Sequence, residues 1–165
     1  MPKIYLGLGS NIGNREEHIS NAIEFIKNIS GILFLRCSSF YETAPWGKED
    51  QNSFINCVTE ISSEIEPEKL FQIIKDIETK CERQKRIKWS EREIDIDILF
   101  YGDMIYDCND IIIPHKDIRD RNFVLIPMKE LEPGFIHPVF KKTISEILSE
   151  TGDKLACKKI NFNDK

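Results

Sequence analysis

The spacing of hydrophobic and polar residues predicts a series of strands and helices along the chain. Two stretches place hydrophobic residues near the 3.6-residue period of an amphipathic helix: residues 15–29 and the segment that opens at Pro67. Residues 94–98 alternate strictly between isoleucine and aspartate, which is typical of a strand with one apolar and one polar face. The full pattern predicts strands over residues 3–9, 33–41, 54–65 and 94–98, and helices over residues 15–29, 67–81, 123–131 and 143–148.

The order of these elements indicates the fold class. A βαββαβ order predicts an α+β sandwich of the ferredoxin-like type, with helices packed on one face of an antiparallel-rich sheet. The helices predicted after residue 98 would be extra C-terminal elements. No repeat, linker or low-complexity segment divides the 165 residues. We therefore expect a single domain over residues 1–165, whose polar end, residues 152–165, is weakly structured.

Composition and charge narrow the class of protein. The net charge of −5 and the pI near 5.3 argue against a dedicated nucleic-acid binder, which usually has a basic surplus. No apolar run approaches the ~20 residues of a membrane span. The five cysteines are scattered without a CxxC pair, which argues against a zinc ribbon and fits reduced thiols. We expect a cytoplasmic protein with no nucleic-acid or membrane partner.

Asp95 and Asp97 are the strongest local sign of chemistry. Side chains alternate faces along a strand, so both carboxylates should lie on one face, about 7 Å apart. Two carboxylates at that spacing can hold a hard cation such as Mg²⁺. The alternative is a strand with one solvated polar face, and the alternation alone does not decide between the two.

A cationic segment precedes this strand. Four of the six residues from 83 to 88 are lysine or arginine, and Trp89 and Arg92 follow them. Lysine and arginine can neutralise the phosphate oxygens that a bound metal does not reach. Taken alone, the segment would be a solvated loop. Its place beside Asp95 and Asp97 favours a site for a metal-bound polyphosphate.

Two further clusters combine aromatic rings with polar groups. The first is Thr43, Trp46, Phe54 and Asn56, and the second is His115, Arg119, Arg121 and Phe123. The first offers the stacking faces and hydrogen-bonding groups that a flat heteroaromatic ligand needs, although an aromatic corner of the core would have the same composition. In the second, a histidine that follows a proline is usually structural. The glycines of residues 7–13 match neither a P-loop nor GxGxxG spacing, so we interpret them as a turn at a strand end.

Taken in order, six motifs resemble those of the 6-hydroxymethyl-7,8-dihydropterin pyrophosphokinases of folate biosynthesis. The motifs are Gly7-Leu-Gly-Ser-Asn11, Ser39-Phe-Tyr-Glu-Thr43, Phe54-Ile-Asn56, the stretch from Arg83 through Arg92-Glu-Ile-Asp-Ile-Asp-Ile-Leu99, Ile113-Pro-His115 and Arg121-Asn-Phe123. The resemblance extends from Tyr5 to about Pro138. The stretch that ends in Asp-Ile-Asp-Ile-Leu is its most specific part.

The resemblance implies a diphosphokinase that transfers pyrophosphate from ATP to the hydroxymethyl group of the pterin and releases AMP. It implies a monomer whose partners are ATP and 6-hydroxymethyl-7,8-dihydropterin, with two Mg²⁺ ions held by Asp95 and Asp97. The residues implied for the pterin are Thr43, Ala44, Trp46, Phe54, Asn56 and Phe123. Those implied for ATP are Glu78, Lys85, Lys88, Trp89, Arg92, Ile98, His115 and Arg121. Those implied to be catalytic are Arg83, Arg92 and Asp97.

The chain also departs from the family pattern in the cationic segment. Where the family usually has Arg-Trp-Gly-Pro-Arg, this chain has Lys88-Trp-Ser-Glu-Arg92, and the usual glycine before Arg83 is Glu82. A lysine, Lys85, replaces a further arginine; it keeps the charge but loses the bidentate fork.

The alternative function is a ferredoxin-like binding module for a nucleotide or RNA. Its affinity for nucleic acid should fall steeply as the salt concentration rises.

Overall fold

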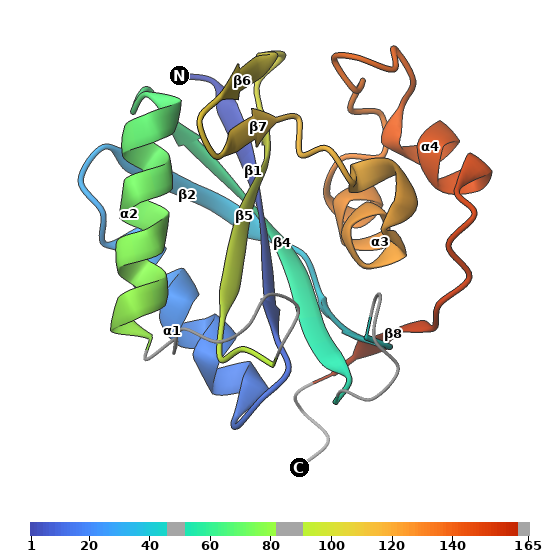
Figure 1. Ribbon diagram of the computed structural model, residues 1–165, viewed down its shortest axis with the longest axis horizontal. Helices are drawn as coiled ribbons and strands as arrows, with labels where there is room; N and C mark the ends of the chain where they lie inside the picture. Colours follow the sequence, from blue (N-terminus) through green and yellow to red (C-terminus); the bar gives the residue numbers. More distant parts are fainter. Residues whose placement is uncertain (46–51, 82–90, 162–165) are drawn as a thin grey trace.

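A single six-stranded antiparallel sheet is the centre of the computed structural model, which describes residues 1–45, 52–81 and 91–161 (Figure 1). Its strands are β1 (Lys3–Ser10), β2 (Ile32–Cys37), β3 (Phe40–Thr43), β4 (Phe54–Ser63), β5 (Asp95–Tyr101) and β8 (Cys157–Ile160). The order is β5-β1-β4-β3-β8, and β2 pairs with the far half of β4. Every pairing within the described residues is antiparallel, so the predicted α+β class is confirmed.

The helices cover both faces of the sheet, so the prediction that they cover one face was wrong. They are α1 (Arg15–Lys27), α2 (Pro67–Lys80), α3 (Asn122–Leu131) and α4 (Ile144–Glu150), and a 3₁₀ turn, η1 (Ile118–Asp120), precedes α3. Helices α1 and α2 lie on one face, and α3 and α4 lie on the other (Figure 1). The reason is that the central strands β1 and β4 are buried on both sides, which requires a second apolar layer. A small hairpin, β6 (Tyr106–Cys108) and β7 (Ile111–Ile113), follows β5.

Two apolar cores result, one on each side of the sheet. The first contains Ile4, Leu6 and Leu8 of β1 together with Ile96 and Ile98 of β5, under α1 and α2. The second contains Tyr5, Val58, Leu99 and Phe100 with α3 and α4. Because side chains alternate along a strand, the second face is also the face to which Asp95 and Asp97 belong.

Two local predictions differ from the structure. The strand predicted over residues 33–41 divides at Ser38, whose hydroxyl accepts a hydrogen bond from Val58 N–H at 3.0 Å. The end predicted to be weakly structured forms β8, which pairs with β3. An edge strand is held by main-chain hydrogen bonds, so the polar composition of Cys157–Ile160 indicated exposed side chains and not an unpaired backbone. Residues 162–165 lie outside the described residues.

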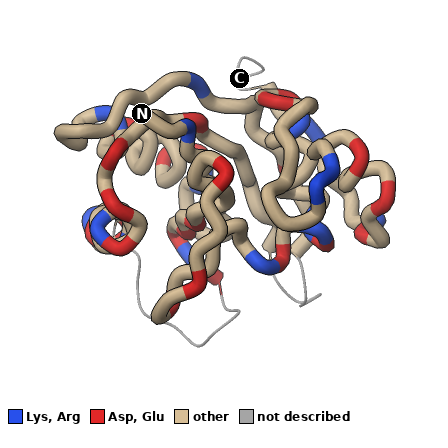
Figure 2. The backbone as a smooth tube through the Cα atoms, turned by 90° about the horizontal axis from the view of Figure 1, so that it is seen from above, with Lys and Arg blue, Asp and Glu red and all other residues tan. Residues whose placement is uncertain are grey.

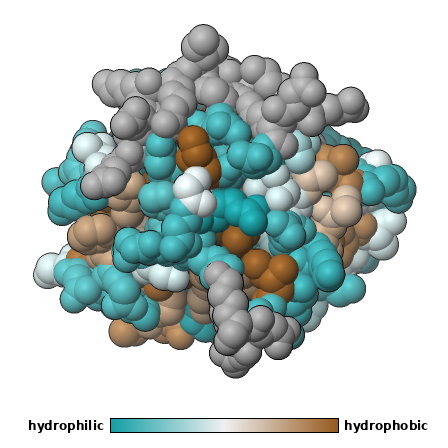
Figure 3. All heavy atoms as spheres, turned by 90° about the horizontal axis from the view of Figure 1, so that it is seen from below, coloured by the Kyte–Doolittle hydropathy of each residue, from teal (hydrophilic) through white to brown (hydrophobic). Residues whose placement is uncertain are grey.

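Charges of both signs are spread over the fold (Figure 2). Across the described ranges, no helix is long and apolar enough to cross a membrane. Strand β1 ends, and β4 and β5 begin, at the bottom of Figure 1. Asn56 of β4 and Asp95 and Asp97 of β5 therefore lie toward this end of the sheet. Seen from below, hydrophobic side chains lie at the centre of this end, among hydrophilic ones (Figure 3).

Candidate active site

Two glycines of β1 lie between the residues predicted for the pterin and those predicted for the metal. Gly9 is paired with Asn56 of β4 on one side and with Asp95 of β5 on the other. Neighbouring strands are about 4.8 Å apart, so Asn56 and Asp95 are about 10 Å apart across the sheet. Gly7 is likewise paired with Asp97. Both glycines lie within the strand predicted over residues 3–9 and leave its surface without side chains. The turn predicted at the strand end is found after Ser10, where Gly13 has a positive φ.

The Asn56 side chain occupies the space that a side chain at position 9 would need. A Cβ added to Gly9 would lie 2.4 Å from Asn56 Oδ1, closer than non-bonded atoms can approach. Asn56 Nδ2 donates to Thr43 Oγ1 at 2.7 Å, and both residues are buried. This bond connects β4 to β3 and fixes the orientation of the carboxamide. The sequence placed Asn56 and Thr43 in one cluster, and the structure brings them into contact.

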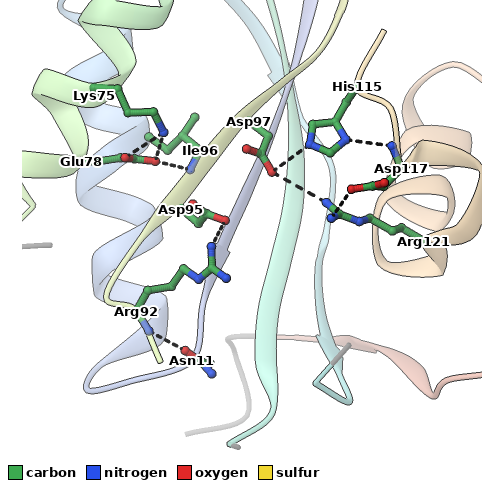
Figure 4. A network of polar contacts seen from close by, with 10 residues as sticks. All are labelled: Asn11, Lys75, Glu78, Arg92, Asp95, Ile96, Asp97, His115, Asp117 and Arg121. Atoms are coloured by element: carbon green, nitrogen blue, oxygen red, sulfur yellow. Dashed lines mark hydrogen bonds and ion pairs between the residues drawn. The ribbon is translucent and has the colours of Figure 1, made fainter. Parts of the chain in front are cut away.

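The structure brings Asp95 and Asp97 to one face of β5, as the alternation predicted (Figure 4). Arg92 donates to the Asp95 carboxylate through its guanidinium. His115 Nε2 lies 3.8 Å from Asp97 Oδ2, and Arg121 lies 4.0 Å from the same oxygen. The side chains of Asp95 and Asp97 are 23% and 37% exposed, so both can be reached from solvent.

The electrostatics of the pair favour a cation. Burial raises the pKa of Asp97, and the neighbouring charge of Asp95 raises it further, against the opposing effect of His115, Lys75 and Arg121. Two carboxylates that repel one another are stabilised when a positive charge is shared between them.

His115 is held by its own main chain and by that of Asp117. Burial lowers the pKa of His115, which favours the neutral ring, although Asp97 acts against this. Nδ1 accepts from Asp117 N–H at 3.3 Å, so in the neutral ring the hydrogen is on Nε2, which faces Asp97. His115 N–H donates to Leu99 O at 3.0 Å. The histidine therefore has a structural anchor and still presents a donor to the site.

Glu78 and Ile98, both predicted to line the ATP site, lie on the side of β5 that is opposite to the Asp95 and Asp97 side chains. Glu78 is buried on α2, where it accepts from Ile96 N–H at 2.8 Å and from Lys75 at 3.0 Å (Figure 4). Because Ile96 lies between Asp95 and Asp97, this bond fixes the outer edge of the strand that carries both carboxylates. The Ile98 side chain is part of the core under α1 and α2, so only its main chain is available to a ligand.

The remaining predicted residues are placed as follows. Phe54 is half-buried, and its ring lies 3.7 Å from the position of an added Gly9 Cβ. Phe123 is half-buried at the start of α3, and the Arg121 guanidinium lies 5.6 Å from the centre of its ring. Ala44 N–H donates to Ala156 O at 3.2 Å. Five predicted residues lie outside the described part of the chain: Trp46, Arg83, Lys85, Lys88 and Trp89.

Asn11 is a site residue that the sequence did not single out by chemistry. It follows the glycine strand and is fully buried. Its Oδ1 accepts from Arg92 N–H at 2.8 Å (Figure 4). Within the sequence, the only available signal was its place in the Gly-Leu-Gly-Ser-Asn motif, because the contact joins residues 81 positions apart.

Comparison with known proteins identifies the family of the chain. Residues 5–133 match the family described as 7,8-dihydro-6-hydroxymethylpterin-pyrophosphokinase (HPPK). The 2-amino-4-hydroxy-6-hydroxymethyldihydropteridine pyrophosphokinase of Aquifex aeolicus is 38% identical over 157 residues, which are 95% of this chain and 97% of that protein. The enzyme of the same name from Haemophilus influenzae is 34% identical, over 90% of this chain and 92% of its own.

A solved structure shows the same fold in a longer protein. The wild-type HPPK-DHPS of Plasmodium falciparum with SDX-DHP superposes with a TM-score of 0.71 at 17% identity. The match covers 91% of this chain and 43% of that one, so the chain spans less than half the length of that protein. The family match and the two relatives of similar length establish that the chain is a member of the 7,8-dihydro-6-hydroxymethylpterin-pyrophosphokinase family.

Proposed function

We propose that this chain transfers pyrophosphate from ATP to the hydroxymethyl group of 6-hydroxymethyl-7,8-dihydropterin. The pterin and the ATP phosphates would lie on opposite sides of the glycine gap, the surface of β1 that Gly7 and Gly9 leave without side chains. The observation that carries the proposal is the register of β1: Gly9 lies between Asn56 and Asp95. Asn56, whose amide would bind the pterin edge, and Asp95, whose carboxylate would bind the metal, are thus separated by one strand that has no side chain at this position. A flat ligand at Asn56 would place its substituent near Asp95 and Asp97.

The donor set of the nucleotide side fits magnesium. Among the residues that the structure describes, no group of three or more His, Cys, Asp or Glu side chains could hold a metal. Mg²⁺ is commonly bound by one or two carboxylates together with substrate phosphates, and Asp95 and Asp97 supply two. When bound there, two Mg²⁺ ions would neutralise the phosphate oxygens of ATP.

The cationic side chains around the carboxylates support the same assignment. Arg92 and Arg121 lie beside Asp95 and Asp97, and the Nε2–H of His115 faces Asp97. In the presence of ATP, these donors would contact phosphate oxygens and stabilise the charge that develops during transfer. Arg83, Lys85, Lys88 and Trp89 would add to this side, although they lie outside the described residues.

The pterin side requires hydrogen bonds at the ring edge and contacts with the ring faces. Asn56 and Thr43 form a fixed pair of polar groups that can pair with the donors and acceptors of the pterin edge. Phe54 and Phe123 are half-buried and would contact the two faces of its ring, and the main chain near Ala44 and Trp46 would add further edge contacts.

The reaction itself is an in-line displacement at the β-phosphorus. The hydroxymethyl oxygen forms a bond to this phosphorus, and the bond from the phosphorus to the oxygen that bridges to the α-phosphate breaks. AMP leaves with that oxygen. By analogy with the family, Asp97 is the candidate acceptor of the hydroxyl proton, and the protein contributes chiefly by positioning and charge neutralisation.

The product distinguishes this reaction from an ordinary kinase reaction. Purified protein incubated with ATP, Mg²⁺ and the pterin should yield AMP and the pterin diphosphate. A parallel reaction with a chelator in excess of Mg²⁺ should yield neither. ADP and a pterin monophosphate as products would show that the assignment of the reaction is wrong.

We further propose that the chain acts as a monomer in the cytoplasm. The described contacts of the site join β1, β3, β4, β5 and the segments that flank them within one chain, so these residues come together without a second copy. Sedimentation at assay concentrations should give a mass near 19.3 kDa. A larger species that carries the activity would contradict this.

A further inference from the structure

We propose that Asn11 is a positioning residue for pyrophosphoryl transfer, and that it acts through Arg92. The inference rests on the proposed function, because Arg92 is taken there to contact the phosphates. Asn11 itself does not reach the carboxylates. Its contacts instead determine where the main chain of Arg92 lies.

Asn11 holds Arg92 by two hydrogen bonds to its main chain. Asn11 Oδ1 accepts from Arg92 N–H at 2.8 Å, and Asn11 N–H donates to Arg92 O at 3.2 Å. The pairing of β1 with β5 ends at Gly9 and Asp95, so Arg92 lies beyond the paired region. The Asn11 contacts therefore replace the strand pairing that Arg92 lacks, and they do so with a fully buried side chain.

The Arg92 side chain then extends from this fixed point to the metal-binding face. Its guanidinium contacts the Asp95 carboxylate (Figure 4). An arginine side chain has several rotatable bonds, and the position of its head group depends on a fixed main chain. Misplacement of a catalytic group by about 1 Å can reduce turnover by about 100-fold. An anchor for Arg92 should thus affect the rate without contacting either substrate.

The amide nitrogen of the Asn11 side chain connects this anchor to the pterin side. Asn11 Nδ2 donates to Asn52 O at 3.5 Å, and Asn52 Nδ2 donates to Glu91 Oε1 at 2.9 Å. Asn52 immediately precedes the segment that leads into β4, and Glu91 immediately precedes Arg92. The four residues close a ring of contacts that joins the end of β1 to the approaches of β4 and β5. Glu91 takes part in this ring at a position where the family usually has proline.

A purely structural role for Asn11 makes a different prediction. In that case its loss would lower stability, and turnover per folded molecule would be unchanged. If Asn11 acts through Arg92, its loss should matter only while the Arg92 side chain is present. A double-mutant cycle separates the two roles, because groups that act as a unit are not additive.

The experiment measures AMP formation at saturating ATP, Mg²⁺ and pterin for wild type, Asn11→Ala, Arg92→Ala and the double variant. We expect Asn11→Ala to lower kcat by about 10- to 100-fold, with the KM for pterin changed less than threefold. In the Arg92→Ala background, the same substitution should change kcat by less than threefold. Asn11→Asp keeps the acceptor for Arg92 N–H and should recover at least threefold over Asn11→Ala.

Two controls complete the design. Asn28→Ala removes an exposed asparagine that donates to Glu24 O at the end of α1, and it should leave kcat within twofold of wild type. Thermal midpoints confirm that each variant is folded at the assay temperature. If Asn11→Ala does not fold, Asn11→Ser takes its place in the cycle, because serine is too short to reach Arg92 N–H.

Three outcomes would overturn the inference while the proposed function stands. They are a folded Asn11→Ala variant with kcat within twofold of wild type, equal losses in the wild-type and Arg92→Ala backgrounds, and an Asn11→Asp variant as slow as Asn11→Ala. A wild-type protein that forms no AMP would overturn the proposed function, and this inference with it.

Discussion

Gly9 is required by its neighbours and not by its own backbone, because its φ is not among the positive values found at Gly13, Gly31 and Gly102. An alanine there would have an ordinary strand conformation, but its Cβ would lie 2.4 Å from Asn56 Oδ1. The Asn56 carboxamide would have to rotate away, which would break its bond to Thr43. The space over β1 would also be lost to a ligand.

We therefore expect Gly9→Ala to weaken pterin binding by about tenfold or more, since overpacking of a fixed site typically costs about 1–3 kcal/mol. Calorimetric titration with pterin, in the presence of a non-hydrolysable ATP analogue, measures the effect. Gly134→Ala is the matched control, because no heavy atom lies within 4 Å of its added Cβ. Unchanged pterin affinity in folded Gly9→Ala would exclude the gap as part of the site.

Asp97 should be needed for turnover but not for folding. If it holds Mg²⁺, Asp97→Asn should lower turnover by at least about 100-fold, which is about 2.7 kcal/mol of barrier. Burial first, and then the charge of Asp95, raises the pKa of Asp97 in the folded protein. A carboxyl whose pKa is raised on folding stabilises the protein less as pH rises from the unfolded pKa through the folded one.

At pH 7 without metal, the Asp97 charge therefore opposes folding, and Asp97→Asn should have an equal or higher thermal midpoint. The difference from wild type should disappear below about pH 4, where the carboxyl is protonated in both states. Thermal melts from pH 3 to 7 and a turnover assay at saturating Mg²⁺ check both parts. A folded variant that keeps a third of wild-type activity would rule out the metal site.

At the scale of secondary-structure elements, local patterns could be predicted and long-range register could not. The alternation of Ile94 to Ile98 specified β5 and the shared face of its aspartates, because that information lies within five residues. The pairing of Gly9 with both Asn56 and Asp95 depends on three distant strands. The same is true of Asn11, whose partner Arg92 is 81 residues away, and of the β3–β8 pairing that organises a polar segment.

One side chain of helix α2 accepts a hydrogen bond from the outer edge of strand β5. Glu78 accepts from Ile96 N–H at 2.8 Å, a group that faces away from β1. Glu78→Ala should leave this buried N–H without its acceptor and lower stability by about 1–3 kcal/mol. Because Asp95 and Asp97 flank Ile96, turnover per folded molecule should fall as well, whereas Glu78→Gln keeps an acceptor and should lose less of both.

Thr143→Ala is a suitable comparison for Glu78→Ala. Thr143 caps α4 by accepting from Glu146 N–H, and Glu146 caps it in return. Its loss should lower stability by about 1 kcal/mol without affecting turnover, because α4 contributes no residue to the site. Chemical denaturation and AMP assays on the variants distinguish the two. Equal activity losses in Glu78→Ala and Thr143→Ala would show that β5 does not depend on Glu78.

At the scale of the whole molecule, ion pairs around one buried carboxylate connect the α3 layer to the sheet. Glu60 of β4 is buried, with Lys3 at 2.9 Å and Arg36 at 2.5 Å, and both cations also contact Glu132 after α3. Burial raises the pKa of Glu60, but the bonds from Lys3 and Arg36 outweigh it, so the net shift is downward. This layer includes His115, Arg121 and Phe123, so its docking also places one wall of the site.

Acid should therefore loosen this layer. A carboxyl whose pKa is lowered on folding contributes stability that is present above its unfolded pKa, about 4.3 for glutamate, and is lost as pH falls through the folded pKa. Glu60→Gln should lower stability at pH 7 by about 1.5–3 kcal/mol. We expect a loss near the lower figure, because Lys3 and Arg36 are half-exposed and their charges are screened by solvent.

Between pH 4.5 and 3 the Glu60→Gln variant should lose less stability than wild type, because the group that titrates is gone. Denaturation curves across that interval measure the slope. Parallel pH dependence in Glu60→Gln and wild type would show that other carboxylates control acid unfolding.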